Sequence, residues 1–381
     1  MSLDQIATAK IKASLLAKGI NFDLDLFKQI EKPFYDNQFV YGKTSENITP
    51  EHKFPQILGL GNKVITALLR RENSPWSLRI EEGEVQLYNS NNHIMTVGLP
   101  ERPAYFDKTL NDGTKSQSII AVAGEDTPGF FLYPYCYYFS EGKQCGFCSM
   151  KSTRKTVGKH MVSEFSEENI AEATRLFQNT PWRDIRLISV TMGTCKTDKE
   201  TREKVIKPIR WMYDALDPKI PIHVLAHPPK DYGLIEEFKD AGVTSIAFNL
   251  EVYDPQRFEE ICPGKAQLYG YEKWVEALMQ AKNVFGDYNT FCGLIWGMES
   301  QESTIAGHQY FLEEKIGIAS NVFHADPRSV LRKHLHPTEE QILQIAKAES
   351  ELFKKYPHSR TIFSVSMRST LDWEVYRGDL G

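Results

Sequence analysis

From residue 127 onward, the chain alternates between short apolar runs and amphipathic helical patterns, and this alternation constrains the fold most. Six apolar runs have the length and composition of strands, at residues 129–135, 185–193, 220–229, 245–253, 288–297 and 320–328. Helical patterns follow them, at residues 165–177, 199–216, 231–242, 254–261 with 271–285, 302–315 and 337–356. Nearly continuous apolar strands separated by helices are typical of a parallel sheet covered by helices.

The sequence therefore predicts an α/β fold, a partial TIM-like (β/α)6 barrel of parallel strands over residues 126–357. An α+β region at residues 1–125 precedes it and could cap the barrel, and residues 358–381 form a C-terminal extension. Within the first region we expect helices at residues 3–18 and 52–73, short strands in SLRIEEGEVQLY and HIMTVGL, and a loop at 101–126. Such barrels place their chemistry at the C-terminal ends of the strands.

Composition and charge exclude several classes of protein. The chain has 381 residues, 41% hydrophobic and 25% charged, as in ordinary globular proteins. A net charge of −5 without a basic stripe argues against a nucleic-acid partner. The apolar stretches are shorter than the ~20 residues that span a bilayer, so we expect no membrane segment. The N-terminal pattern predicts an amphipathic helix instead of a signal peptide, and we expect a cytoplasmic protein.

Three of the six cysteines, Cys136, Cys145 and Cys148, lie within thirteen residues, directly after the first predicted strand of the barrel. Three thiolates can hold three irons of a [4Fe–4S] cluster and leave the fourth iron open. The same thiolates could bind zinc, for which His160 is the nearest candidate fourth ligand. Buried cysteines without a metal are the third alternative. We favour the cluster because the three thiols share one glycine-containing loop.

The other three cysteines are scattered. Cys262 and Cys292 are expected in the core. Cys195 follows the second strand, where it could be a further ligand, a hydrogen-atom donor or inert. No second C-x2-C pair is present, so an additional cluster held only by cysteines is not expected.

The cysteine loop resembles that of radical S-adenosylmethionine (SAM) enzymes. In that family a loop after the first strand carries C-x3-C-x2-C, with an aromatic residue before the last cysteine. Here the spacing is C-x8-C-x2-C, and Phe147 is the aromatic residue. The longer first gap departs from the usual spacing, although the loop can still supply three thiolates.

Two later strands add to the resemblance. The segment GLIWGME carries Gly293, Ile295 and Gly297 in a pattern that packs near the adenine of SAM in this family. The segment FNLEVYD places Asn249 and Glu251 where the family positions polar groups on the ribose and methionine parts. Together with the cysteine loop, these segments follow the order along the chain that the family shows.

The turn after the second strand, SVTMGTC, is less similar to the family pattern. Many members have a Gly-Gly-Glu-like turn there, which binds the amino group of SAM. Thr191, Gly193 and Thr194 could serve in its place, but the carboxylate is missing. In style, the runs NLEVYDPQRFEEICPGK and HADPRSVLRKHLHPTEEQ are similar to the biotin-synthase-like subgroup.

The resemblance implies two cofactors, a [4Fe–4S] cluster and SAM, and a reductant such as flavodoxin or ferredoxin. One electron would cleave SAM to methionine and a 5′-deoxyadenosyl radical, which would take hydrogen from a substrate. A small-molecule substrate is expected because no peptide-recognition module is evident. Methylation, rearrangement and C–C bond chemistry in cofactor or natural-product biosynthesis all stay open, and the oligomeric state is not predicted.

Substrate residues are expected at the remaining strand ends. His223 and His227 project to one face of the third strand, with His227 nearer the C-terminal end. On the sixth strand His324, Asp326 and Arg328 alternate, and the planar fork of Arg328 suits a carboxylate or phosphate. The alternatives are a hydrogen-bonded core histidine and a solvated strand end.

Two other functions fit part of the pattern. A zinc- or iron-dependent TIM-like hydrolase would contain one metal ion and work in air. A non-enzymatic iron–sulfur carrier or scaffold would transfer its cluster and would not bind SAM. A radical SAM enzyme is favoured over both, because the nucleoside-type motifs of the fourth and fifth strands follow the cysteine loop in order.

Overall fold

The computed structural model describes residues 3–36, 55, 57–61, 63–65, 70–157, 162–360 and 369–379. Its main sheet has seven strands among these residues, in the order β13-β11-β10-β9-β8-β7-β6. Six of them, from β7 to β13, pair in parallel, and β6 pairs antiparallel with β7. The bounds are β6 Ile120–Ala123, β7 Thr127–Tyr133, β8 Ile188–Met192, β9 Ile222–Leu225, β10 Ser245–Ala247, β11 Thr290–Cys292 and β13 Gly317–Ile318.

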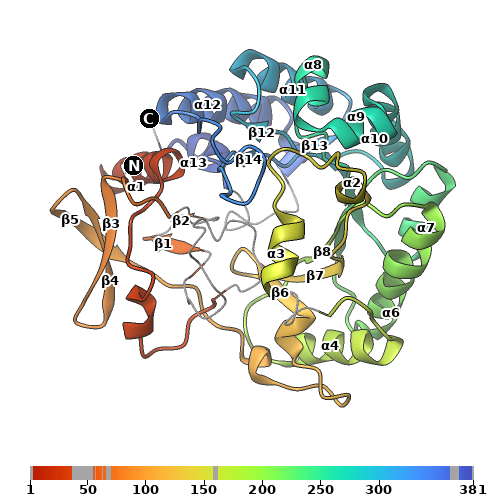
Figure 1. The fold of residues 1–381 in the computed structure, drawn as a ribbon, viewed down its shortest axis with the longest axis horizontal. Coiled ribbons are helices and arrows are strands. Elements are labelled where there is room, and N and C mark those ends of the chain that lie inside the picture. The colour runs from red at the N-terminus through yellow and green to blue at the C-terminus, as the bar shows by residue number, and fades with distance from the viewer. Residues whose placement is uncertain are drawn as a thin grey trace.

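Helices connect the parallel strands and cover the outer side of the curved sheet (Figure 1). The larger ones are α4 Glu167–Asn179, α6 Lys207–Ala215, α7 Gly233–Asp240, α10 Tyr271–Phe285, α11 Gln301–Glu313 and α12 Glu339–Lys355. Capping boxes at Ser166 and Thr338 start α4 and α12, since each hydroxyl accepts a bond from the third backbone N–H of the helix. The predicted α/β fold with six strand–helix units is confirmed.

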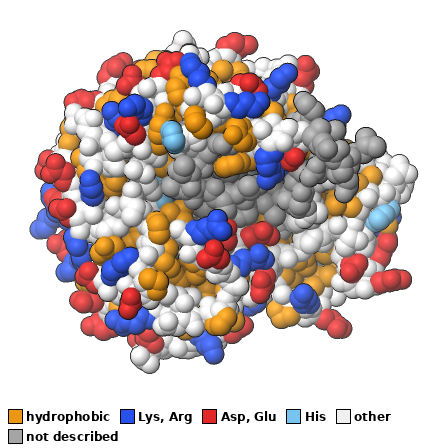
Figure 2. Space-filling view, turned by 180° about the vertical axis from the view of Figure 1, so that it is seen from behind, with side chains coloured by type: hydrophobic (Ala, Val, Ile, Leu, Met, Phe, Trp, Pro, Cys, Tyr) orange, Lys and Arg blue, Asp and Glu red, His pale blue; other side chains and the backbone are white. Residues whose placement is uncertain are grey.

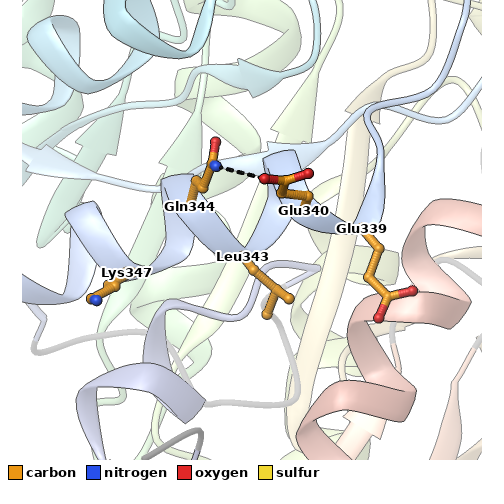
Figure 3. A pocket seen from close by; sticks show the side chains of 5 residues that line it. All are labelled: Glu339, Glu340, Leu343, Gln344 and Lys347. Atoms are coloured by element: carbon orange, nitrogen blue, oxygen red, sulfur yellow. Dashed lines mark hydrogen bonds between the residues drawn. The ribbon is translucent and has the colours of Figure 1, made fainter.

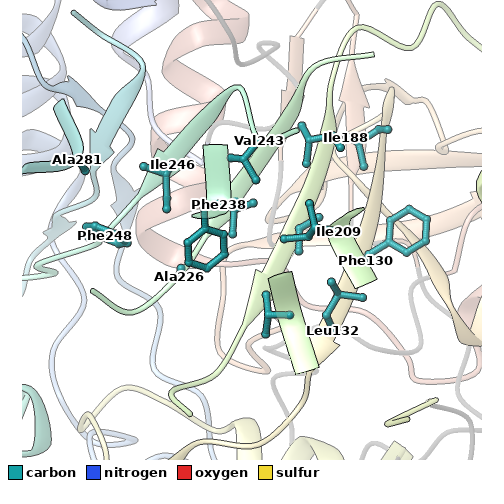
Figure 4. Packing of buried hydrophobic residues seen from close by; sticks show 14 of the residues in the cluster. Phe130, Leu132, Ile188, Ile209, Ala226, Phe238, Val243, Ile246, Phe248 and Ala281 are labelled. Carbon is teal, nitrogen blue, oxygen red and sulfur yellow. The ribbon is translucent and has the colours of Figure 1, made fainter. Parts of the chain in front are cut away.

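The core lies between the sheet and this helical layer. Figure 4 shows Phe130 and Leu132 of β7 and Ile188 of β8 near Ile209 of α6, all in one buried cluster. These side chains are fully or almost fully buried. Because strand residues alternate between faces, the opposite face of β7 carries Phe131 and Tyr133 toward the inside of the barrel.

The N-terminal region has its own small core. The helix α1 Leu3–Lys18 and the antiparallel strands β3 Trp76–Glu81, β4 Glu84–Asn89 and β5 Asn92–Val97 form as the pattern predicts. Apolar side chains from these elements and from β1 Leu58–Leu60 form one cluster. The α1 helix also packs on α12, and α12 packs on α13 Asp372–Tyr376, so the two ends of the chain meet on the barrel (Figure 1).

The helix expected at residues 52–73 is wrong where the structure describes that segment. Strands β1 and β2 Lys63–Ile65 pair there in an antiparallel hairpin. Gly61, at the turn, has a φ of +61°, and the backbone of Gly59 pairs with Gly98 in both directions at 2.9 Å. Glycine disfavours helix, and a strand with a glycine between two buried leucines can approach another backbone closely.

Strand boundaries also differ from the prediction. Of the expected sixth strand at 320–328, only β14 Asn321–Val322 is strand, and the sixth parallel strand of the main sheet, β13, lies just before that range. The expected fifth strand is divided into β11 and β12 Ile295–Trp296. The expected loop at 101–126 contains β6, which extends the main sheet. An apolar pattern reports burial, whereas strand assignment needs a hydrogen-bonded neighbour.

Charged side chains of both signs are mixed on the surface. On the face shown in Figure 2, basic and acidic side chains are interspersed over the visible described surface. In the part of the chain that the structure describes, no helix has the length and apolarity that crossing a membrane requires.

Candidate functional site

The three clustered cysteines lie at the C-terminal end of β7. Cys136 is the N-cap of the short helix α2 Tyr137–Ser140, and Cys145 and Cys148 precede α3 Met150–Val157. The three side chains are half-buried. The backbone N–H of Cys148 donates to the carbonyl of Cys145 at 3.0 Å, which curls the end of the loop. The structure therefore brings all three thiols to the edge of the sheet where barrel chemistry takes place.

Three neighbouring segments, the end of α8 Pro255–Ile261, the loop after β14 and the turn after β8, hold the cysteine loop, residues 136–148, in place. The N–H of Gly146 donates to Ile261 O at 2.7 Å, and the carbonyl of Gly146 accepts from Leu331 N at 2.9 Å. At the start of the loop, Tyr137 N donates to Thr194 O at 2.8 Å. Backbone bonds to three separate segments fix the loop without using its thiols.

The turn after β8 lies directly against this loop. The N–H of Gly193 donates to Tyr133 O at 2.8 Å. A Cβ added at Gly193 would lie 1.7 Å from Tyr135 O, so only glycine fits there. Thr191, the second-last residue of β8, is half-buried and pairs with Phe131 of β7. The predicted trio of Thr191, Gly193 and Thr194 is thus next to the cysteines, and the demonstrated role of Gly193 is close packing.

A buried cation also lies beside the loop. Lys265, on α9 Pro263–Leu268, donates from Nζ to Glu251 Oε1 at 3.0 Å and to Asn249 O at 2.6 Å. Burial alone would lower the pKa of Lys265, but the Glu251 carboxylate and the thiols of Cys145 and Cys262 outweigh it and raise the pKa. Lys265 therefore keeps its charge, and sequence reasoning missed it.

The environment of Cys145 favours its thiolate. A hydrogen bond with the buried thiol of Cys262 lowers the pKa of Cys145 against the effect of burial, and the charge of Lys265 lowers it further. By contrast, burial raises the pKa of Cys148 strongly, and the nearby Cys145 adds to this effect. Cys262 and Cys292 are fully buried, as expected. The thiolate is the form that binds metals, so Cys145 is prepared for a positively charged group.

This donor set fits an iron–sulfur cluster. Within the described ranges, no three His, Cys, Asp or Glu side chains converge closely enough to hold one metal ion. Each thiolate of a cluster binds a different iron, so its ligands need not meet at one point. The expected fourth zinc ligand, His160, lies outside the described residues.

The predicted motifs of the fourth and fifth strands lie side by side. Asn249 Oδ1 accepts from Gly293 N at 2.9 Å, and a Cβ on Gly293 would lie 2.7 Å from the Asn249 side chain. The backbone of Glu251 receives a bond from Ile295 N at 2.8 Å. Gly297 has a φ of +97° and turns the chain after β12. The structure thus places the five candidate SAM residues in two neighbouring segments, one after β10 and one after β11: Asn249, Glu251, Gly293, Ile295 and Gly297.

The carboxylate of Glu299 has a structural role. Both of its oxygens accept from Tyr253 N, at 3.0 and 3.1 Å, and one accepts from Asp254 N at 2.7 Å. It also accepts from Ser303 Oγ at 2.8 Å. These bonds join the segment after β10 to the start of α11.

The two histidines of the third strand differ in their surroundings. His223 is buried and bonded to Ser245 Oγ at 2.8 Å, as in the core alternative. At the strand end, His227 Nδ1 donates to Pro228 O at 2.6 Å, and its Nε2 is bonded to the hydroxyl of Tyr138. Burial lowers the pKa of His227 to about 3, so the ring is neutral and touches the cysteine loop through Tyr138.

The polar residues after β14 lie in a loop, so the expected alternation of His324, Asp326 and Arg328 along a strand is wrong. Asp326 accepts from Ser149 Oγ at 2.7 Å and from Arg328 N at 2.8 Å. Burial alone would raise the pKa of Asp326, but these bonds and the Arg328 charge outweigh it and lower the pKa. Because Ser149 follows Cys148, Asp326 ties this loop to the cysteines.

Of two pockets in the described part of the chain, one lies at the site. One, of about 400 Å³, opens beside Cys136 and is lined by Tyr135, Arg154 and others. Another, of about 430 Å³, lies along α12 (Figure 3). Its lining contains no candidate site residue: Glu339, Glu340, Leu343, Gln344 and Lys347.

Comparison with known families agrees with this geometry. Residues 134–303 match the family model of the Radical SAM superfamily. The chain carries a radical SAM domain. The matched segment begins just before Cys136 and contains the candidate SAM residues through Gly297. The resemblance of the cysteine loop to the superfamily is thus confirmed. Membership implies an enzyme with a [4Fe–4S] cluster and SAM. The assignment to the biotin-synthase-like subgroup stays a prediction.

Individual relatives are distant. The bacteriochlorophyllide c C-7(1)-hydroxylase of Chlorobaculum limnaeum is 22% identical over 312 residues, covering 78% of this chain and 77% of the relative. The crystal structure of a methylornithine synthase has a TM-score of 0.47 and 15% identity, with coverage of 67% and 69%. A radical SAM methyltransferase from Sphaerobacter thermophilus has a TM-score of 0.43 and 12% identity, with coverage of 79% and 81%.

Proposed function

We propose that the radical SAM domain uses Cys136, Cys145 and Cys148 to hold the cluster and acts on a small molecule in cofactor or natural-product biosynthesis. The observation that carries this proposal is the cysteine loop, anchored at three segments beside a buried lysine. When bound, the reduced cluster and SAM supply a 5′-deoxyadenosyl radical that can take hydrogen from an unactivated C–H bond. Methylation, rearrangement and C–C bond chemistry are the reaction outcomes that remain within the proposal.

The chain's own residues prepare the cluster site. Lys265 and Cys262 favour the thiolate of Cys145, and the bonds of Gly146 prevent the loop from moving away. Asp326 holds Ser149, and thereby the backbone next to Cys148. A site whose ligands are oriented in advance loses less conformational entropy on binding.

SAM would lie between the ends of β8, β10 and β11. Asn249 Oδ1 is already bonded to Gly293 N, so its Nδ2 group is the part available to a ligand. The absence of side chains at Gly193 and Gly293 lets the Tyr135 carbonyl and the Asn249 side chain pack closely there, which shapes the walls of the site. Phe147 and Ile295 supply apolar surface, which suits the adenine, and Thr191, Thr194 and Glu251 supply polar atoms.

For the substrate, His324 and Arg328 remain the best candidates. The Nδ1 atom of His324 is buried and has no hydrogen-bond partner among the described residues. Arg328 is half-buried and its guanidinium pairs with Asp326, and its positive charge suits an anionic group. His227 and Asp326 would act by orienting their neighbours, since their polar atoms are already bonded. A flavodoxin or ferredoxin as reductant and a cytoplasmic location complete the proposal.

The test is anaerobic. The protein would be reconstituted with iron and sulfide, mixed with SAM and dithionite, and assayed for 5′-deoxyadenosine by mass spectrometry. Cys148→Ala should abolish the nucleoside, whereas Cys292→Ala, a buried cysteine on β11, should retain it. Deuterium transfer from candidate metabolites into the nucleoside would then identify the substrate.

Two results would contradict the proposal. One zinc ion and no labile sulfide in the isolated protein, without nucleoside, would favour a TIM-like hydrolase. A complete cluster that transfers to apo-proteins without cleaving SAM would favour an iron–sulfur carrier.

A further inference from the structure

The pocket beside Cys136 lies between the end of β7, the helices α2 and α3, and the turn after β8. Its volume is about 400 Å³. The rings of Tyr135, Tyr137 and Phe139 form much of its wall, and Tyr135 is one of the few large aromatic side chains exposed on the described surface, at 37%. One of the three proposed cluster ligands therefore faces an open, aromatic depression.

Three cations surround this depression. Lys151 and Arg154 come from α3, and Lys196 comes from the turn after β8. The Arg154 guanidinium lies 4.1 Å from the centre of the Tyr135 ring, and Lys196 Nζ lies 5.5 Å from the centre of the Tyr137 ring. In the described part of the chain, none of the three has a carboxylate within 4.0 Å.

One carboxylate lines the pocket, and it is already engaged. Glu200 accepts from the Tyr133 hydroxyl at 2.8 Å and from the backbone N–H of Lys196 at 2.8 Å. The pocket thus carries more positive than negative charge, although the chain as a whole has a net charge of −5. A negatively charged partner is complementary to this part of the surface and not to the molecule in general.

We propose that this pocket and its three cations are the docking site of an acidic one-electron carrier protein. The proposal rests on the proposed function, which needs an electron delivered to a group held by Cys136. In the transfer, the carrier loses one electron and the cluster gains one, while no bond forms or breaks. Cys136 lines the pocket, so a carrier seated there approaches the cluster through one of its ligands.

The residue types support a protein partner over a small anion. Tyrosine, arginine and methionine, which are enriched in protein interfaces, line the pocket as Tyr135, Arg154 and Met150. Electron-transfer complexes are small and short-lived, and opposite charges mainly increase their rate of association. A few lysines and arginines around one exposed aromatic ring meet that requirement.

The test compares two reductants in the full-length, cluster-loaded protein. The triple variant Lys151→Glu, Arg154→Glu, Lys196→Glu reverses the local charge. Reduced flavodoxin and dithionite would each be mixed with the protein in a stopped-flow instrument, and the bleaching of the cluster would be recorded. With flavodoxin at low salt, reduction of the wild type should be at least tenfold faster than that of the variant. Only the wild-type rate should fall steeply as salt is added.

The matched control is Lys10→Glu, Arg210→Glu, Lys347→Glu, which changes the net charge equally at exposed positions outside the pocket. Its rate with flavodoxin should stay within twofold of wild type. Arg154→Lys, which keeps the charge, should also retain most of the rate.

The outcomes separate the two proposals. Formation of 5′-deoxyadenosine with dithionite in every variant supports the proposed function independently of docking. Equal flavodoxin rates in wild type and pocket variant would overturn the docking site, and so would a salt-independent wild-type rate. If the wild type did not cleave SAM with dithionite, the proposed function itself would be overturned. If inorganic phosphate protected Arg154 and Lys196 from chemical modification but flavodoxin did not, the pocket would be a small-anion site.

Discussion

The buried ion pair between the two ends of the chain gives a sharp prediction about stability. Lys12 of α1 donates to Glu374 of α13 at 2.6 Å, and the two side chains are 0% and 1% exposed. The second oxygen of Glu374 has no hydrogen-bond partner among the described residues. In Lys12→Met, the carboxylate would be buried without a countercharge. We expect this to cost about 3–5 kcal/mol, which corresponds to a change in the opening equilibrium of roughly 100- to 5000-fold.

Replacing both partners should restore much of the loss. In Lys12→Met, Glu374→Leu no charge is left in the buried position, and such replacements are often neutral or stabilising. Urea unfolding and hydrogen exchange, measured by mass spectrometry over α1 and α13, would give the free energies of opening. A Lys12→Met protein within 1 kcal/mol of wild type would refute the reasoning, because that cost is well below the about 3–5 kcal/mol expected for an unpaired buried charge. A double variant as unstable as the single one would contradict it as well.

Three further predictions concern the barrel. Burial lowers the pKa of His223 to about 3 from an ordinary 6.5. Between these values the imidazole is protonated in the unfolded chain and neutral in the folded one. The free energy of unfolding should therefore fall by about 1.4 kcal/mol per pH unit as the pH falls below 6.5. Urea titrations should show a flatter profile between pH 4 and 6.5 (a range of about 2.5 units) in His223→Gln. Gly193→Ala should displace the cysteine loop and lose the visible absorbance of the cluster, whereas Gly98→Ala, whose added Cβ would meet backbone at 3.8 Å, should retain it. Lys265→Met should lower iron and sulfide content, because the Cys145 thiolate loses its nearest cation; full content would contradict that role.

Burial periodicity made the barrel predictable. Each parallel strand is a short apolar run, and each following helix has one apolar face, so strand order and helix positions followed from the pattern. The helix predicted at 52–73 was wrong because the apolar spacing there also fits two short strands. The turn at Gly61 favours the hairpin over the helix. The predicted strand through Asp326 was wrong because a loop can also carry polar and apolar residues in alternation, without pairing with a neighbouring strand.

The cysteines were predictable, but their surroundings were not. Three thiols in thirteen residues form a local signal. By contrast, the contact of Cys145 with Cys262 and Lys265 joins positions more than a hundred residues apart. Cys262 and Lys265 were visible only as CPGK at a helix end, a pattern that also fits an ordinary helix start. Ser149 and Asp326 are separated by 177 positions, so their bond required the folded barrel.

The long gap between the first two cysteines has a structural explanation. The residues between Cys136 and Cys145 form α2 and a turn at Gly142, whose φ is +67°. Lys143 N then bonds back to Tyr138 O at 2.8 Å, which closes the excursion. Beyond it, Gly146 is held by Ile261 and Leu331. Because each end of the loop is fixed by backbone bonds to other segments, the additional residues can form α2 and a turn without changing where the thiols are held. The same excursion brings Tyr137 and Phe139 to the pocket, so the atypical spacing builds the aromatic wall of the proposed docking site.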